Sequence, residues 1–486
     1  MTSTTTQSQL TTLVSEGSLQ GIQISSSMAS KPGSTPGFYN PKRRMGRDVT
    51  VLSVAQWLTD ESIKNQRRAL AVSLPAPTDE SNLTRPTKVQ RCALVDASVS
   101  STSSSQTPSS ENNKKIRPAR LLDTTCATGI QGLRNIVESP ILAEVALDNL
   151  SKTLSKDDCE TSVTPELHVI LNDLDENAVQ LTKQNANSTL QQQQQINDSN
   201  IHVTQRAAQS LLHEETFEVS VLDPFGSVQP FLDAALAKSP NGGLIEVCAT
   251  DVGVLYGARP SIAKRHYHVQ LAKKRPPCYR ERGVRVLLAA IAQAAGRYDR
   301  GIVPMYGISM EHYCLVSVKV VRGAKAADLT ARSVQPVRIC RVCGDSQIID
   351  EGAENKIKNS CNCGCDPINL QQEGPLWIGP LHDVEFVKGM ANIANLDEAQ
   401  GFISKKTRTF LDQLKEEAAI NHMFHRRPGV AAKARTPKLT KVLEELQHRG
   451  YKASRTHFCV KSLKSDASAE EFDDAVMAIL DKQDKA

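Results

Sequence analysis

The sequence is poor in aromatic residues and has no apolar segment long enough to cross a bilayer. Phenylalanine, tyrosine and tryptophan make up 4% of its 486 residues, and no apolar run approaches the roughly 20 residues that a membrane helix needs. We also see no apolar leader, so the twelve cysteines do not suggest a secreted disulfide-bonded protein. The rest, 40% hydrophobic and 23% charged, is typical of a soluble protein of two or three domains.

Three segments lack the apolar periodicity of folded structure. Residues 1–37 are rich in serine, threonine and glycine, and we predict that they are disordered. The polar segment near 75–115 ends in a serine tract, and the segment near 188–199 contains five consecutive glutamines. Both are interpreted as low-complexity insertions within a folded domain that begins at Phe38.

Four apolar segments, each expected to be a strand, end in an acidic residue: Asp123, Asp173, Asp223 and Asp251. A further strand signal at 201–203 lacks such an acid, and helical patterns separate these segments. Two more strands, 302–306 and 313–320, are expected to pair antiparallel and close the sheet. The pattern predicts an α/β fold of the doubly wound class, in which ligands bind at the carboxyl edge of a parallel sheet.

The segment 120–134 has the organisation of a nucleotide-binding first turn. A strand ends at Asp123, small residues allow a ligand to approach the backbone, and a helix starts near Gly129. The three-glycine fingerprint of dinucleotide enzymes is missing, and S-adenosylmethionine enzymes use this looser version. Asp173 would then be placed for a ribose diol, and Arg47, in a loop before the apolar residues 49–54, suits a carboxylate or phosphate ligand.

Asp223, Pro224 and Phe225 together suit the methylation of an exocyclic amine. Such an amine is a poor nucleophile until acceptors hold its N–H groups. Asp223 and the carbonyl of Pro224 offer two acceptors, and Phe225 offers a face on which a flipped base can stack. The plain alternative is a strand that ends at a turn, with Asp223 capping the residues after it.

Five cysteines lie between positions 340 and 365, in the order Cys340, Cys343, Cys361, Cys363 and Cys365. The two-residue spacing of the first pair lets both thiolates reach one tetrahedral ion. We expect a structural zinc site formed by four of the five, without a choice among the last three. The alternative is a set of reduced surface thiols that have lost the ion.

Positive charge is concentrated between residues 422 and 464, where the acidic residues are Glu444 and Glu445. A helix with one apolar face is predicted after Pro437, which leaves a basic surface for phosphate groups. A solvated charged face is the alternative. The residues predicted to contact RNA are Arg426, Arg427, Lys438, Lys452 and Arg455.

These features together resemble the tRNA (guanine-N2)-dimethyltransferase family, which modifies guanosine 26 of tRNA with S-adenosylmethionine. The resemblance extends from Phe38 to about Asp466. Its most specific motifs are Phe38-Tyr39-Asn40-Pro41, Arg47-Asp48, Asp223-Pro224-Phe225-Gly226, Thr250-Asp251, Gly374-Pro375-Leu376-Trp377 with Gly379-Pro380-Leu381, and the segment Gly450 to His457.

The resemblance implies a methyltransferase domain over 38–322, a smaller α+β C-terminal tRNA-binding domain over 323–466, and a tail over 467–486. It implies that Arg47 and Arg134 hold the methionine part of the cofactor, that Asp173 binds the ribose, and that Asp223 orients the guanine amine. The adenine contact departs from the family, because Ala207 and Ala208 stand in the place of an acid-containing triplet.

The expected function is therefore transfer of methyl groups to N2 of guanosine 26, giving N2,N2-dimethylguanosine, with tRNA as partner and neither a membrane nor an obligate protein partner. Two alternatives remain: a non-catalytic tRNA-binding or RNA-folding protein of the same fold, and an amino-methyltransferase that acts on adenine or glutamine. The nucleus is the expected compartment, with the mitochondrion as a second one.

Overall fold

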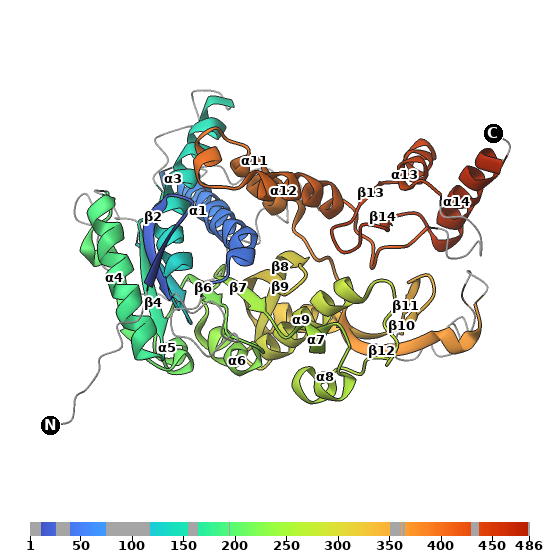
Figure 1. The fold of residues 1–486 in the computed structure, drawn as a ribbon, viewed down its shortest axis with the longest axis horizontal. Coiled ribbons are helices and arrows are strands. Elements are labelled where there is room, and N and C mark those ends of the chain that lie inside the picture. The colour runs from blue at the N-terminus through green and yellow to red at the C-terminus, as the bar shows by residue number, and fades with distance from the viewer. Residues whose placement is uncertain are drawn as a thin grey trace, which may run out of the picture.

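A seven-stranded sheet forms the centre of the larger part of the molecule (Figure 1). The computed structural model describes residues 11–25, 39–73, 117–153, 164–193, 195–349, 361, 365–428 and 437–484. The strand order is β5-β4-β3-β6-β7-β9-β8; neighbours from β5 to β7 pair parallel, and β9 pairs antiparallel with β7 and β8. The bounds are β3 Ala119–Asp123, β4 Leu167–Asp173, β5 Ile201–Gln205, β6 Val219–Leu222, β7 Leu244–Ala249, β8 Arg300–Ser309 and β9 Cys314–Arg322.

Helices between the strands cover both faces of this sheet, so the predicted doubly wound α/β class is confirmed. The helix that follows β3 packs closely against β4 because Gly132 has no side chain. A Cβ atom at Gly132 would lie 2.2 Å from Leu171 Cδ2 of β4. The helices are α3 Ile130–Thr153, α4 Glu176–Gln192, α5 Ala208–Glu214, α6 Gln229–Lys238, α7 Val252–Leu255, α8 Pro260–Tyr267, α9 Tyr279–Gly296 and α10 Ala324–Arg332.

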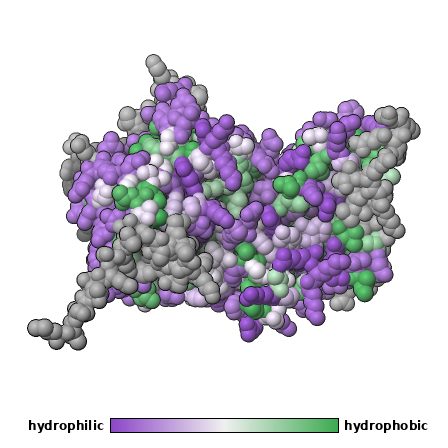
Figure 2. Space-filling view, in the orientation of Figure 1, coloured by the Kyte–Doolittle hydropathy of each residue, from purple (hydrophilic) through white to green (hydrophobic). Residues whose placement is uncertain are grey.

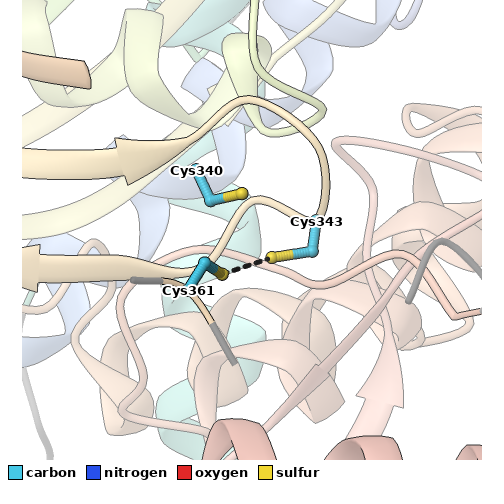
Figure 3. Close-up of side chains that lie close together, drawn as sticks. All are labelled: Cys340, Cys343 and Cys361. Atoms are coloured by element: carbon cyan, nitrogen blue, oxygen red, sulfur yellow. Dashed lines mark hydrogen bonds between the residues drawn. The ribbon is translucent and has the colours of Figure 1, made fainter. Parts of the chain in front are cut away.

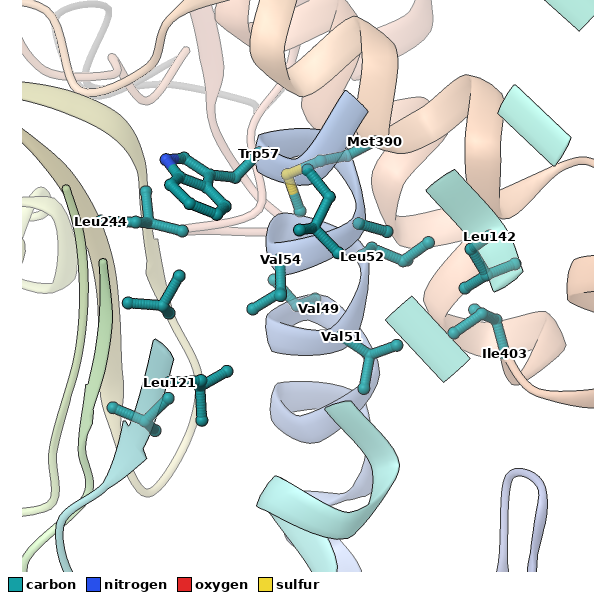
Figure 4. Packing of buried hydrophobic residues seen from close by; sticks show 14 of the residues in the cluster. Val49, Val51, Leu52, Val54, Trp57, Leu121, Leu142, Leu244, Met390 and Ile403 are labelled. Carbon is teal, nitrogen blue, oxygen red and sulfur yellow. The ribbon is translucent and has the colours of Figure 1, made fainter. Parts of the chain in front are cut away.

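Helix α1, Arg44–Ser73, is buried on nearly all sides over its first four turns (Figure 4). Val54 and its neighbours on α1 lie between Leu121 and Leu244 of the sheet on one side and Leu142 and Ile403 on the other. Some buried polar residues of α1 bond within the helix, as Thr59 Oγ1 donates to the carbonyl of Ala55 at 2.9 Å. Others bond to the surrounding core, as Ser53 Oγ donates to Glu246 Oε1 at 2.6 Å. The prediction that Arg47-Asp48 lies in a loop is wrong, because both residues belong to the first turn of this helix.

Residues 11–25 correct the prediction that positions 1–37 are disordered. They form an antiparallel hairpin of β1, Thr11–Glu16, and β2, Leu19–Ser25, whose register brackets a turn at Gly17. Leu19, Ile22 and Ile24 are buried in the main core. Threonines and alternating aliphatic residues suit a strand, and it is burial against the rest of the chain that orders this short hairpin.

The C-terminal half divides differently from the predicted boundary at residue 323. Helices α11, Val384–Ala394, and α12, Lys405–Ala418, share the main core with α1. A three-stranded antiparallel sheet, β11-β10-β12, uses Ser346–Ile348, Val334–Cys340 and Leu370–Trp377. The region after residue 323 thus begins on the main core and not beside it.

A separate small core is formed by α13, Leu439–His448, β13, Ala453–Arg455, β14, Leu463–Ser465, and α14, Ala469–Asp484. Because Phe472, Val476 and Ile479 of α14 lie in that core, the predicted tail over 467–486 is wrong: its described residues are part of this unit. The face of the molecule in Figure 2 is mainly hydrophilic, with scattered apolar residues. Within the described residues, we find no helix that combines the length and the apolarity of a membrane span.

The two predicted insertions have different outcomes. The segment near 75–115 lies outside the described residues. The segment near 188–199 begins inside α4, which continues to Gln192, and ends in a short 3-10 helix, Asp198–Asn200.

Candidate active site and cysteine cluster

The acids that end β3 and β4, Asp123 and Asp173, lie at the carboxyl edge of the sheet, as predicted. Asp123 is 2% exposed, and its Oδ2 has no hydrogen-bond partner among the described atoms. Burial raises the pKa of Asp123 to about 8, and the charges of Asp223 and Asp173 add to this effect. A buried carboxylate with an unsatisfied oxygen is an acceptor prepared for a donor or a cation.

Asp173 fixes the backbone around that edge. Its Oδ2 accepts from the N–H of Ala127 in the turn after β3, at 2.9 Å, and its Oδ1 accepts from the N–H of Asp175. The neighbouring Asn172, which our sequence reasoning missed, donates to the carbonyls of Thr124 and Arg206 at 3.1 and 3.0 Å. This buried amide joins the ends of β3, β4 and β5, and an asparagine within an apolar strand was the signal for it.

Asp223 and Phe225 are both accessible from solvent. The Asp223 side chain is 34% exposed, and Phe225 is 54% exposed despite its large apolar ring. The turn is fixed from β7, because Gly226, at φ 83°, donates its N–H to Thr250 Oγ1 at 2.8 Å. Pro224, between the acid and the aromatic ring, removes a competing N–H from this turn.

A partner of Asp223 was not predicted. Arg43 Nη1 and Nη2 donate to Asp223 Oδ1 and Oδ2 at 3.0 and 2.7 Å, which forms a bidentate ion pair. The Arg43 guanidinium also stacks on the ring of Tyr313, 4.6 Å from its centroid. Burial alone would lower the pKa of Arg43, but the charge of Asp223 reverses this and raises it.

The assignment of Arg134 to the cofactor stays a prediction, and in the structure this side chain is bonded to protein partners. Arg134 is fully buried and directs its donors to Glu138, to Asp48 at 2.7 Å, to Glu16 at 3.0 Å and to the carbonyl of Phe402. All five of its N–H groups are used, so a ligand would have to displace one of these partners. These contacts join α1, α3 and the N-terminal hairpin. The sequence alone does not show whether an arginine after a nucleotide-binding turn contacts a ligand or other parts of the protein.

Arg47 is engaged in the same cluster. Its Nε and Nη2 donate to the two oxygens of Glu16 at 2.7 and 2.6 Å, and its guanidinium lies 4.9 Å from the ring centroid of Tyr39. Glu16, in the segment predicted to be disordered, therefore occupies the position of a carboxylate ligand for Arg47. The assignment of Arg47 to the cofactor stays a prediction, and a ligand carboxylate would compete with Glu16.

Ala207 and Ala208 follow β5, on the same edge as Asp173. Ala207 is the N-cap of α5 and makes no side-chain capping bond, while Ala208 is buried. Thr204 and the N–H of Arg206 both bond to Asn172, which ties this segment to β4. A contact to adenine from this segment would come from the backbone, since alanine offers no polar side chain.

Four of the five candidate zinc ligands lie together at the end of β10. The Sγ atoms of Cys340, Cys343 and Cys361 are mutually within 4.8 Å (Figure 3). Cys343 and Cys361 Sγ are 3.4 Å apart, and Cys340 and Cys365 Sγ are 3.5 Å apart. Three thiols close to one another, with that of Cys365 beside one of them, offer the four donors that a tetrahedral ion needs. Cys363 lies outside the described residues.

The basic residues of the C-terminal unit differ in accessibility. Arg427, Lys438 and Lys452 are exposed and Arg455 is partly exposed, as an RNA-binding surface requires. Arg426 does not fit that prediction: it is 6% exposed, approaches Asp345 Oδ1 at 3.6 Å and lies over the ring of Phe472. Its charge joins the zinc-site loop to α14.

Comparison with known proteins connects these features. A family model described as N2,N2-dimethylguanosine tRNA methyltransferase matches residues 21–156 and 159–477. The chain is 30% identical to a tRNA (guanine(26)-N(2))-dimethyltransferase of Thermococcus kodakarensis, over 73% of this chain and 85% of that protein. It is also 30% identical to a human tRNA (guanine(27)-N(2))-dimethyltransferase, over 56% of this chain and 37% of that protein.

The chain spans about two fifths of the length of the bovine, human and macaque relatives. Among solved structures, the complex of Trm1 from Pyrococcus horikoshii with S-adenosyl-L-methionine matches with a TM-score of 0.66 at 24% identity, covering 96% of this chain and 99% of that one. This likeness extends the fold agreement through the C-terminal half. The family model covers well over half of the residues, and the chain belongs to the N2,N2-dimethylguanosine tRNA methyltransferase family.

Proposed function

We propose that this protein transfers methyl groups from S-adenosylmethionine to the exocyclic N2 of guanosine 26 in tRNA, giving N2,N2-dimethylguanosine. The observation that carries the proposal is the arrangement after β6: a half-open carboxylate at Asp223, the carbonyl of Pro224 and the exposed ring of Phe225, fixed to β7 by Thr250. Acceptors beside an exposed aromatic face suit an amine on a flipped base.

The residues at the edge fit the cofactor. Asp123 presents a buried oxygen without a partner among the described atoms, and an ammonium or sulfonium group would supply the missing positive charge. Asp173, at the tip of β4, is placed for a ribose diol, although backbone N–H groups already occupy one lone pair on each of its oxygens. When bound, S-adenosylmethionine supplies an electrophilic methyl group.

The protein's own contribution is to position the amine. Asp223 and the Pro224 carbonyl accept the N–H groups, so that the nitrogen lone pair is directed away from them, and Phe225 fixes the plane of the base. Positioning, and not a strong base, is the requirement, because the nitrogen can lose its proton after it has gained the methyl group.

The four-cysteine cluster and the basic surface have supporting roles in this proposal. A zinc ion bound by Cys340, Cys343, Cys361 and Cys365 would have no open coordination position, so its role is structural. Exposed Arg427, Lys438, Lys452 and Arg455 would bind the tRNA backbone.

Position 27 is a second candidate, because vertebrate relatives are named for it. The archaeal relatives named for position 26 support our choice, since the chain covers 78%, 85% and 93% of three of them.

The test uses four tRNA transcripts with guanosine at position 26, at 27, at both or at neither, and mass analysis of the nucleosides. Dimethylguanosine in every transcript with guanosine 26, and in no other, is the expected result.

A further inference from the structure

Arg43 lies in the proposed active site, but the proposed function gives it no role. In that proposal Asp223, Pro224 and Phe225 position the amine. Arg43 ends a 3-10 helix, Pro41–Arg43, immediately before α1, and its guanidinium reaches Asp223 beyond the end of β6. The two side chains are separated by 180 residues in the sequence, which is why motif reasoning did not connect them.

Three observations indicate that the Arg43 guanidinium is held rigidly. It makes two parallel hydrogen bonds to Asp223, a geometry that fixes both its distance and its plane. It also lies over the ring of Tyr313, a residue that is itself 3% exposed. The backbone behind it is also fixed, because Arg43 N–H donates to the Asn40 carbonyl at 3.0 Å and a Cβ atom on Gly46 would lie 3.0 Å from Tyr313 Oη.

This ion pair leaves Asp223 able to bind a substrate. A carboxylate has about four lone-pair sites, and a bidentate arginine uses one on each oxygen. The Asp223 side chain remains 34% exposed, whereas that of Arg43 is 15% exposed. The open side of the carboxylate can therefore accept from an amine while Arg43 stays in place.

The surrounding charges explain why a cation is needed here. Asp123 and Asp173 lie on the same sheet edge, close enough that Asp223 helps to raise the pKa of Asp123. A carboxylate among other acidic groups is stabilised in place by a nearby positive charge. Arg43 supplies that charge at 2.7 Å.

We propose that Arg43 is a positioning residue for the methyl transfer: it fixes the plane of the Asp223 carboxylate and holds that acceptor in place for the guanine amine. The inference rests on the proposed function of this site. It assigns Arg43 a role in turnover, and none in binding tRNA or cofactor.

The test compares Arg43→Met, Arg43→Lys and Arg43→Ala with the matched control Lys42→Met, which removes an exposed charge from the adjacent position. Single-turnover rates are measured at saturating S-adenosylmethionine and tRNA, alongside the Kd of each. We expect the Met variant to lose roughly tenfold to a hundredfold in rate, as for loss of hydrogen bonds to a charged group. Both Kd values and the control rate should stay near wild type, and lysine should restore part of the loss.

Chemical rescue separates positioning from a structural role. Added guanidinium should raise the rate of Arg43→Ala and leave Asp223→Asn unchanged, since the cation acts through that carboxylate. A wild-type rate in Arg43→Met, or a loss confined to the Kd values, would overturn the inference while leaving the proposed function intact. If the wild-type protein methylates no transcript, the proposed function itself fails and this inference falls with it.

Discussion

Replacing Glu16 by glutamine tests whether the N-terminal hairpin stabilises the fold through its buried charge cluster. Glu16 is 2% exposed, and its two oxygens accept from Arg47 at 2.7 and 2.6 Å and from Arg134 at 3.0 Å. Burial alone would raise the pKa of Glu16, but the hydrogen bonds and charges of Arg47 and Arg134 lower it to about 2.

The stability that ionised Glu16 contributes to the fold follows from this pKa shift. The pKa falls from 4.5 to about 2 on folding, and each unit corresponds to about 1.4 kcal/mol, which gives about 3 kcal/mol of stability at neutral pH. Because the folded-state pKa is depressed, this contribution is complete above pH 4.5 and is lost as pH falls toward 2. Removing one partner of a buried pair typically costs about 3 to 5 kcal/mol, which agrees.

The assay is urea unfolding at pH 7 and at steps down to pH 3. Glu16→Gln should lose about 3 kcal/mol at pH 7 and should show a shallower loss of stability below pH 4.5 than the wild type. The control is Glu215→Gln, which breaks the half-exposed pair with Arg120 and should cost at most about 1 kcal/mol. A Glu16→Gln loss no larger than that of the control would refute the reasoning.

The remaining predictions concern metal, RNA and cofactor. Purified protein should contain one zinc per chain by elemental analysis; Cys343→Ser should lose it with a lower Tm, and Cys363→Ser should retain it. Lys452→Ala should weaken tRNA binding and reduce the slope of log K against log salt by about 1 with an unchanged Tm, whereas Arg426→Ala should lower the Tm first. Cofactor affinity should rise with pH up to about 8, the raised pKa of buried Asp123, because only the ionised carboxylate attracts a cation. Calorimetry in buffers of different ionisation enthalpy should detect the proton that Asp123 releases on binding. An affinity independent of pH would contradict this prediction.

The sequence predicted the sheet well because strand signals are local. Apolar segments that end in Asp123, Asp173 and Asp223 need no knowledge of the rest of the fold, and each occurs where a parallel sheet places ligands. The cysteine cluster was predictable for the same reason, since close spacing limits which thiols can meet.

The errors arose where long-range contacts decide the outcome. The composition of residues 1–37 suggests disorder, yet Glu16 meets Arg134 across 118 positions and orders the hairpin. The charge of Arg426 suggested an RNA contact, whereas its side chain is buried near Asp345 and over the ring of Phe472. Arg43 was missed because its partner, Asp223, lies 180 residues away.

The central claim is tested most directly by incubating the wild-type protein and Asp223→Ala with labelled S-adenosylmethionine and an unmodified tRNA transcript that carries guanosine 26. The account predicts label in N2,N2-dimethylguanosine with the wild type, and a large loss of turnover in the variant at unchanged cofactor and tRNA binding. Equal turnover by Asp223→Ala would contradict the role of that carboxylate. The absence of label with a wild-type protein that binds tRNA would favour a non-catalytic, tRNA-binding role for this fold.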